Sequence, residues 1–173
     1  MRHFSTISEL HRANNYRPPE NPLISLIRCD KGNSCPIADS EFTSDFYMIR
    51  LKKTKSGTYK NYSALSFAGP RQVVEIRGIE TEENGLTIYF HEDLLIGHPL
   101  RQVIGNFSYF DRDSYEAMRL SAKEEQIIWE LFNKIESECH SNQDEYTRGI
   151  MLSHIESILK YAQRFYKRQF ISG

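Results

Sequence analysis

Residues 46–53 have the sequence FYMIRLKK, and this stretch decides the fold of the chain. Two sets of side chains alternate along it: Tyr47, Ile49 and Leu51 form one set, and Met48, Arg50 and Lys52 form the other. Because successive side chains of a β-strand point to opposite faces, the alternation predicts a strand over residues 42–53 with one face against a core.

Several other short segments on either side of this stretch also have the character of strands. They are residues 23–27, 58–62, 65–67, 72–77 and 86–90, and the turn signals between them are Ser56-Gly57, Gly69-Pro70 and Asn84-Gly85. Many short strands at near-regular spacing predict a small sandwich or barrel over residues 23–115.

The N-terminal residues 1–22 are predicted to be an arm that leads into this domain. A short helix is expected at residues 5–12, and Asn14-Asn15 and Pro18-Pro19 end it. Such an arm is either ordered by packing or left mobile.

The C-terminal residues 116–173 are predicted to be helical. Ser121 and Glu124 form a capping box, and apolar side chains then recur at helical spacing up to the break at Ser141-Asn142. A second amphipathic helix begins near Asp144, so the two helices form an antiparallel hairpin. The fold class expected for the whole chain is therefore α+β.

Composition and motifs exclude several kinds of function. The 173 residues carry a net charge of −1, which removes the electrostatic reason to expect nucleic-acid binding by this piece alone. The chain has no motif of a zinc protease, a serine hydrolase or a nucleotide-binding loop, and its histidines form no HxH or HxxxH pair. We therefore expect no metal, no cofactor and no catalytic residue.

The cysteines and the N-terminus bear on the cellular compartment. Three cysteines without a CxxC motif favour a reducing cytoplasm over a disulfide framework, and Cys29 and Cys139 are expected to be small packing residues. The chain has neither an apolar signal segment nor a run of about 20 apolar residues that could span a membrane. A cytoplasmic protein without a membrane partner is expected.

Several segments together resemble the N-terminal domains of AraC-type bacterial transcription regulators of the Bacteroidetes kind. They are ENPLISLI, FYMIRLKK, SFAGPRQVVEI, GLTIYFHEDLL, LSAKEEQIIWELFNKIESECHS and YAQRFYKRQFIS, which together cover nearly the whole chain. One departure lies after Pro70, where the pattern has glycine and this chain has Arg71.

The resemblance implies a cupin-like β-barrel, a double-stranded β-helix, over residues 23–115, followed by the helical hairpin of residues 116–173. The barrel binds a small-molecule effector in some members, and the helices form a homodimer. A DNA-binding helix-turn-helix domain is expected to follow and is absent from this chain, so DNA would be bound only through that missing part.

An effector in such a barrel would meet the polar and aromatic side chains of the strands. The candidates are Tyr47, Arg50, Phe67, Gln72, Tyr89 and His91. Arg50 either faces water or points into the barrel, where its guanidinium would suit a carboxylate or phosphate. His91 is either a hydrogen-bonded residue at the end of a strand or a ligand contact.

The dimer is expected to form through the apolar stripe of the second helix. Its candidate residues are Ile155, Ile158, Leu159, Ala162, Phe165 and Tyr166. Two alternatives stay open: a metal-independent cupin-like isomerase or epimerase using His91 with Tyr89 or Tyr47, and a ligand-free dimerisation module whose barrel is filled by side chains.

Overall fold

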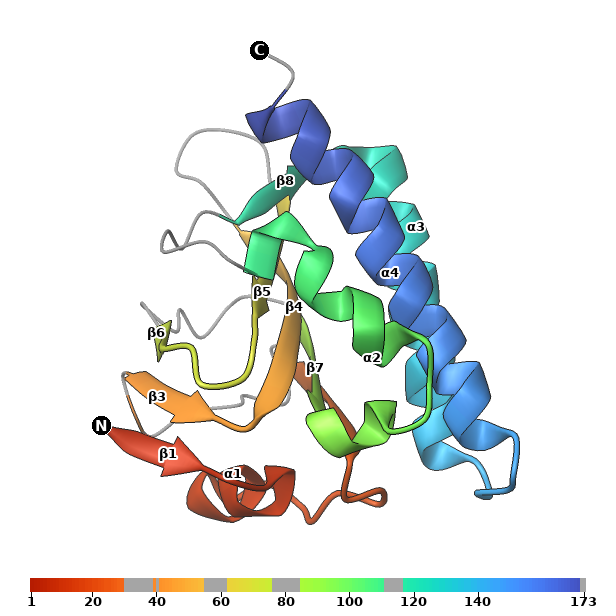
Figure 1. Cartoon of the computed structure of the whole chain (residues 1–173). Helices are drawn as coiled ribbons and strands as arrows, with labels where there is room; N and C mark the ends of the chain where they lie inside the picture. The colour runs from red at the N-terminus through yellow and green to blue at the C-terminus, as the bar shows by residue number, and fades with distance from the viewer. Residues whose placement is uncertain (30–38, 40, 55–61, 76–84, 111–116, 172–173) are drawn as a thin grey trace.

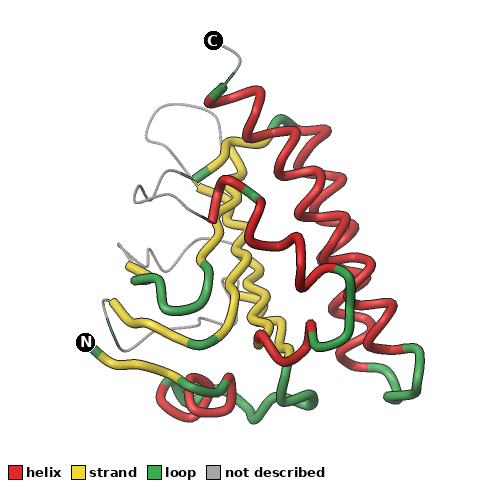
Figure 2. The backbone as a smooth tube through the Cα atoms, viewed as in Figure 1, coloured by secondary structure: helices red, strands yellow, loops and turns green. Residues whose placement is uncertain are grey.

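The computed structural model describes residues 1–29, 39, 41–54, 62–75, 85–110 and 117–171. These residues form an α+β structure with two β-sheets and a C-terminal pair of helices, as the sequence predicts (Figure 1). The strands gather on one side of the molecule and the two long helices lie on the other (Figure 2).

The larger sheet has five antiparallel strands in the order β2-β7-β4-β5-β8. Their bounds are β2 Ile24–Cys29, β4 Phe46–Thr54, β5 Tyr62–Ala68, β7 Gly85–His91 and β8 Met118–Leu120. The single strand predicted over residues 42–53 is divided in the structure: its second part is β4, the middle strand of this sheet, and its first part belongs to a separate strand of the smaller sheet. The expected turn residues Ser56, Gly57 and Asn84, and residues 58–61 and 76–77 of the expected strands, lie outside the described residues.

The register of the larger sheet sorts its side chains onto two faces, because directly opposed residues of antiparallel strands share a face. Ile49 lies opposite Ile88 and Phe67, on the face that packs against the helices. Arg50 lies opposite Thr87 and Ser66, on the other face. The alternation seen in the sequence thus separates the main core from the side of the sheet that faces the N-terminal arm.

The smaller sheet belongs to that second side. It contains β1 (Arg2–Phe4), β3 (Glu41–Ser44) and β6 (Val74–Glu75), in the order β1-β3-β6. Helix α1 (Ile7–Ala13) follows β1, and the Thr6 hydroxyl caps it by accepting a hydrogen bond from the Glu9 amide. Because β1 pairs with β3, the arm is ordered by packing.

A second hydrophobic cluster holds the arm to the rest of the domain. Its buried members are Phe4, Ile7, Leu10, Phe42, Phe46, Met48, Ala68, Val74 and Tyr89. The cluster takes residues from α1, from the smaller sheet and from the outer face of the larger sheet, so all three are packed as one layer against the larger sheet.

The segment after β7 differs from the sequence prediction. Residues 92–110 were expected within the β-domain but form short helical turns: η1 (Glu92–Leu95), α2 (Leu100–Val103), η2 (Ile104–Asn106) and η3 (Ser108–Phe110). In addition, β8 extends the sheet into the region that was expected to be purely helical. Within the described chain the two sheets share no hydrogen-bonded strand pair, so no closed barrel is formed.

The C-terminal helices are α3 (Ala122–His140) and α4 (Thr147–Phe170). The predicted capping box is confirmed, since the Ser121 hydroxyl accepts from the Glu124 amide while the Glu124 carboxylate accepts from the Ser121 amide. Asp144 accepts hydrogen bonds from the Tyr146 and Thr147 amides and so starts α4. The helix pair covers one face of the larger sheet (Figure 1).

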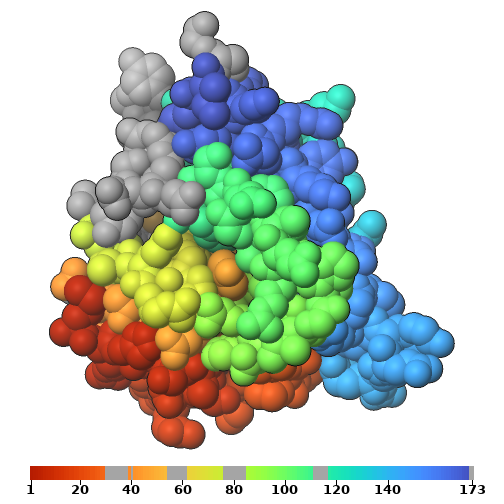
Figure 3. Space-filling model, in the orientation of Figure 1, coloured from red at the N-terminus to blue at the C-terminus, as the bar shows by residue number. Residues whose placement is uncertain are grey.

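All six residues expected at the dimer surface are buried within the single chain. Their exposed fractions are 0% for Ile155, Ile158, Leu159 and Ala162, 3% for Phe165 and 8% for Tyr166. The reason is that α3, the larger sheet and the helical turns of residues 92–110 all pack with α4 in the main core, and the Tyr109 hydroxyl donates to the Leu159 carbonyl at 2.6 Å. The green surface of these turns meets the blue surface of α4 in Figure 3. These side chains therefore offer no free stripe to a partner.

The cysteines also differ from the expectation. Cys29 is in a disulfide bond, whereas Cys139 is a free, buried thiol. The count of cysteines therefore gives no support for a reducing compartment. Among the described helices, none has both the length and the apolar character that crossing a membrane requires.

Candidate functional site

Three polar side chains lie next to one another on the outer face of the larger sheet. Arg50 of β4 lies between Thr87 of β7 and Ser66 of β5, its directly opposed partners. Opposed residues have Cβ atoms roughly 5 Å apart, so the two hydroxyls flank the base of the arginine side chain. Thr87 is 9% exposed, and Arg50 and Ser66 are half-buried.

Tyr89 extends this group by one step along β7. It is two residues beyond Thr87, so it shares the same face and lies diagonal to Arg50. The side chain is 3% exposed, and burial raises the pKa of its hydroxyl while the positive charge of Arg50 lowers it. Because the first effect is the larger, Tyr89 keeps its proton at neutral pH and acts as a hydrogen-bond donor.

The arm adds a second tyrosine close to Arg50. Burial raises the pKa of Tyr16 to about 12, and the Arg50 guanidinium again acts in the opposite direction. The charge of Arg50 thus acts on a tyrosine of the arm and on a tyrosine of β7. The arm therefore contributes directly to the surroundings of this charge.

None of the four side chains Arg50, Ser66, Thr87 and Tyr89 has a hydrogen bond or ion pair within the part of the chain that the structure describes. We call this set the donor patch. A guanidinium and three hydroxyls present mainly donors, and groups of this kind are normally paired when they are removed from water. The donor patch is thus a group of polar side chains without protein partners on the arm side of the larger sheet.

His11 fixes the arm beside the donor patch. Its Nδ1 donates to the Arg17 carbonyl at 2.6 Å, and its Nε2 accepts from the Ser25 hydroxyl at 3.0 Å. The Tyr16 amide donates to the His11 carbonyl at 2.9 Å, and the two rings make an edge contact. Burial lowers the pKa of His11, which keeps the imidazole neutral in this arrangement.

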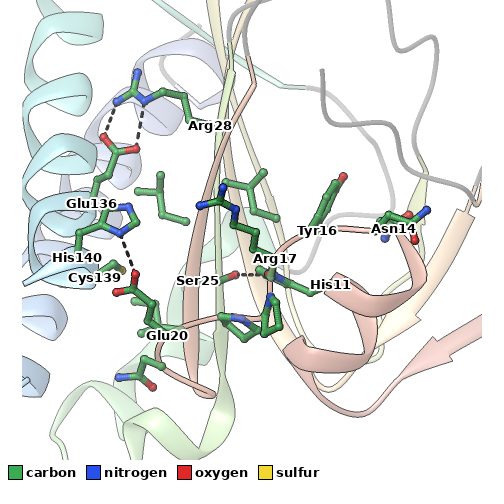
Figure 4. A pocket seen from close by; sticks show the side chains of 17 residues that line it. His11, Asn14, Tyr16, Arg17, Glu20, Ser25, Arg28, Glu136, Cys139 and His140 are labelled. Atoms are coloured by element: carbon green, nitrogen blue, oxygen red, sulfur yellow. Dashed lines mark hydrogen bonds and ion pairs between the residues drawn. The ribbon is translucent and has the colours of Figure 1, made fainter. Parts of the chain in front are cut away.

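A pocket of about 910 Å³ runs along β2, the free edge strand of the larger sheet. The arm forms one wall and the end of α3 forms the other (Figure 4). Ser25 and Ile27 of β2 line it, and they lie opposite Tyr89 and Thr87 in the register of the sheet. The pocket therefore borders β2, and the donor patch begins on β7, the neighbouring strand of the sheet.

The opposite wall of the pocket is held by ion pairs. Arg28 donates to both oxygens of Glu136, at 2.7 and 3.1 Å, and His140 lies 3.5 Å from Glu20. Burial raises the pKa of the Cys139 thiol to about 11, so it is no activated nucleophile. Figure 4 shows the Arg28–Glu136 and His140–Glu20 pairs on this wall.

Two residues expected to contact a ligand lie on the helix face instead. Tyr47 stacks on Phe90 with ring centroids 4.9 Å apart, and Phe67 packs on Tyr109 at 4.3 Å. Both rings are packed against the main core. Their positions follow from the sheet register, which gives odd and even residues of β4 opposite faces.

Gln72 and His91 have structural roles. The Gln72 side chain accepts from the Gly69 amide at 2.7 Å and donates to the Phe110 carbonyl. His91 accepts from the Asp93 amide at 3.1 Å, which caps η1, and its Nε2 lies 3.2 Å from the Ser5 carbonyl. His91 is thus the hydrogen-bonded residue at a strand end that was one of its two expected roles.

Of the expected ligand contacts, the structure brings together only Arg50 and Tyr89. It adds four residues that the sequence reasoning missed: His11, Tyr16, Ser66 and Thr87. Ser66 and Thr87 could have been found by pairing the strands in register with Arg50. Nothing in the local sequence of the arm reveals that Tyr16 lies near Arg50, since that proximity depends on how the arm folds back.

Comparison with models of known protein families gives no match for this chain, and comparison with curated proteins gives none either. Among the described residues, no three His, Cys, Asp or Glu side chains are grouped closely enough to hold a metal ion.

Proposed function

We propose that this chain is the effector-binding and dimerisation domain of an AraC-type transcription regulator. The observation that carries the proposal is the donor patch, whose guanidinium and hydroxyls have no partner among the described residues. Side chains kept unpaired at a sheet face beside a pocket are typical of a place that a ligand fills. The AraC-like motifs supply the class of protein.

In this proposal, the two sheets correspond to the two layers of a cupin-like double-stranded β-helix. The smaller sheet, α1 and the outer face of the larger sheet enclose one hydrophobic cluster, which is the packing expected between such layers. The effector would bind at the donor patch, next to the arm. A DNA-binding part would follow the helices, and a regulator of this kind acts in the cytoplasm.

The position of Tyr16 suggests how binding would be sensed. The arm reaches the surroundings of Arg50 through Tyr16 and is tied to β2 through His11 and Ser25. A ligand that neutralises Arg50 changes the electrostatic surroundings of Tyr16, and a ligand with different affinities for two arm positions shifts the population between them. The arm thus provides the moving part that a sensor requires.

The dimer of this proposal needs a surface other than the buried stripe of α4. The large apolar side chains left exposed on the helix pair, within the described residues, are Tyr146 at 66%, Ile150 at 40% and Ile171 at 58%. Tyr146 and Ile150 are one helical turn apart and lie on one side of α4. We assign the contact between subunits to this start of α4.

The catalytic alternative pairs His91 with Tyr89 or with Tyr47. His91 and Tyr89 are two residues apart on β7 and share a face of the sheet, whereas Tyr47 lies on the other face. A general acid or base must lie within hydrogen-bond reach of its substrate. Both ring nitrogens of His91 already have partners within the chain, the Asp93 amide and the Ser5 carbonyl, so we favour the binding role.

Two experiments test the proposed function. Sequencing the coding region beyond Gly173 is expected to show a pair of helix-turn-helix segments. A thermal-shift screen of a metabolite library against the purified chain is expected to find a compound that raises Tm and protects the arm from proteolysis. A stop codon directly after Gly173 would contradict the regulator role, and a screen without any stabilising compound would contradict the sensor role.

A further inference from the structure

We propose that the effector carries an anionic group, a carboxylate or a phosphate, which Arg50 binds with help from Ser66, Thr87 and Tyr89. This inference rests on the proposed function and adds the chemical class of the ligand.

The positive charge of Arg50 favours an anionic ligand. Arg50 is half-buried, and the groups that face it from neighbouring strands are hydroxyls and not carboxylates. A guanidinium that has no carboxylate partner within the chain keeps its charge and its five N–H donors available to an anion from solution. Among the described residues no acidic side chain pairs with Arg50.

The donor patch has more hydrogen-bond donors than acceptors, which also favours an anion. Arginine has five N–H donors and no acceptor, and each of the three hydroxyls donates one hydrogen bond. A carboxylate or phosphate accepts several bonds at once through oxygens in a planar or tetrahedral array. A neutral hydroxyl ligand such as a sugar would leave most of the donors of Arg50 unused.

The register of the sheet places the three hydroxyl side chains next to Arg50. Thr87 and Ser66 flank Arg50 across neighbouring strands, and Tyr89 lies one diagonal step away. The two short hydroxyls therefore flank the base of the Arg50 side chain, and the longer Tyr89 side chain lies on the same face. Because all four residues lie on β-strands of one sheet, this arrangement is rigid before a ligand arrives.

The test uses isothermal titration and thermal shift with three probes at constant ionic strength. The probes are inorganic phosphate, benzoate and benzamide, and the last two differ in charge but hardly in shape. We expect phosphate or benzoate to bind and raise Tm, and benzamide to do neither. Phosphate binding without benzoate binding identifies a phosphate ligand, and the reverse identifies a carboxylate.

Variants locate the site of binding. Arg50→Gln is expected to weaken anion binding by roughly tenfold or more, the usual effect of losing a charge-assisted hydrogen bond. Arg50→Lys keeps the charge but loses the planar fork, so we expect an intermediate affinity. Arg12→Gln, an exposed arginine on α1, is the matched control and should leave binding unchanged. Circular dichroism of each variant checks that it folds.

Several outcomes would overturn the inference. They are equal binding of benzamide and benzoate, equal anion affinity in the wild type and Arg50→Gln, and the absence of any binding by either anion. A neutral metabolite that binds the wild type and Arg50→Gln alike would leave the sensor role standing while removing the anion assignment. Arg50-dependent anion binding without a downstream helix-turn-helix pair would support the anion assignment while contradicting the regulator role.

Discussion

At the scale of single residues, Arg71 shows a backbone requirement behind one departure from the AraC-like pattern. Its φ angle is +66°, in the left-handed region that glycine adopts without steric cost. Glycine is the residue that the resemblance leads one to expect after Pro70. The Arg71 side chain pairs with Glu92 at 2.8 Å, so this chain accepts backbone strain while gaining an ion pair.

Replacing Arg71 separates these two effects. Arg71→Ala removes the ion pair but keeps the strained backbone, whereas Arg71→Gly removes both. We expect Arg71→Gly to be more stable than Arg71→Ala by about 1 kcal/mol in urea unfolding, because the left-handed cost disappears. The exposed pair itself is worth roughly 0.5 kcal/mol. Equal stability of the two variants would contradict the strained geometry.

His11 gives the fold a dependence on pH. Burial lowers the pKa of His11 in the folded chain below its ordinary value, so the folded state disfavours the protonated ring. The stabilising contribution is therefore complete above about pH 6.5, the unfolded pKa, and is lost as the pH falls through the lower folded pKa. His154, whose pKa burial also lowers, acts in the same direction.

The measurement is urea unfolding of the wild type and His11→Gln between neutral and mildly acidic pH. Glutamine cannot titrate but is able to donate and accept like the neutral ring. We expect the wild type to lose more stability on acidification than the variant. Parallel losses would show that His11 does not titrate in the way that its burial implies.

At the scale of secondary-structure elements, α4 illustrates what periodicity does and does not predict. The spacing of Ile155, Ile158 and Leu159 correctly indicates an amphipathic helix, and all three are buried. It does not indicate what buries them. The turns of residues 92–110 cover part of this stripe, and their short 3-10 segments lack a periodic signal long enough to be recognised.

Leu159 is therefore expected to be a folding residue rather than an interface residue. Its side chain is fully buried, so Leu159→Asp places an unpaired carboxylate in the core and should cost roughly 4 kcal/mol or more. Ser153→Asp, at an exposed site on the same helix, should change stability by no more than about 0.5 kcal/mol. A folded, monomeric Leu159→Asp protein would instead support the original dimer stripe.

The strands show the same division between what the sequence predicts and what it leaves open. The alternation over residues 46–53 predicts β4 and its two faces, because side-chain period is a property of the strand itself. It does not decide whether the face of Arg50 meets water or protein, since that depends on the arm and on strands far away in sequence. The sites of Ser66 and Thr87 are likewise set by register, a pairing between distant segments.

At the scale of the whole molecule, the larger sheet separates two hydrophobic clusters. One lies between the sheet and the C-terminal helices, and the other lies between the sheet and the arm. The proposed ligand site belongs to the arm side, whereas the proposed dimer contact belongs to the helix side. A signal between them has to pass through the sheet or around its β2 edge, where the arm and α3 line one pocket.

The dimer contact is tested on the exposed start of α4. We expect the chain to sediment as a dimer and Ile150→Asp to raise the dimer dissociation constant at least tenfold, because a charge is placed on an apolar contact. Gln126→Asp adds the same charge at an exposed site on α3, away from this contact, and serves as the control. Wild-type protein that remains monomeric at high micromolar concentration would rule out this contact.

The pairing of β1 with β3 has a practical consequence for anyone who shortens the chain. A recombinant version starting at Leu23 would lose Phe4, Ile7 and Leu10, which together cover the arm-side cluster. The rings of Phe42, Phe46 and Tyr89 would then be exposed to solvent, and the edge of β3 would lie open to other molecules. Such a product is expected to precipitate during purification, although the helical half of the molecule would be intact.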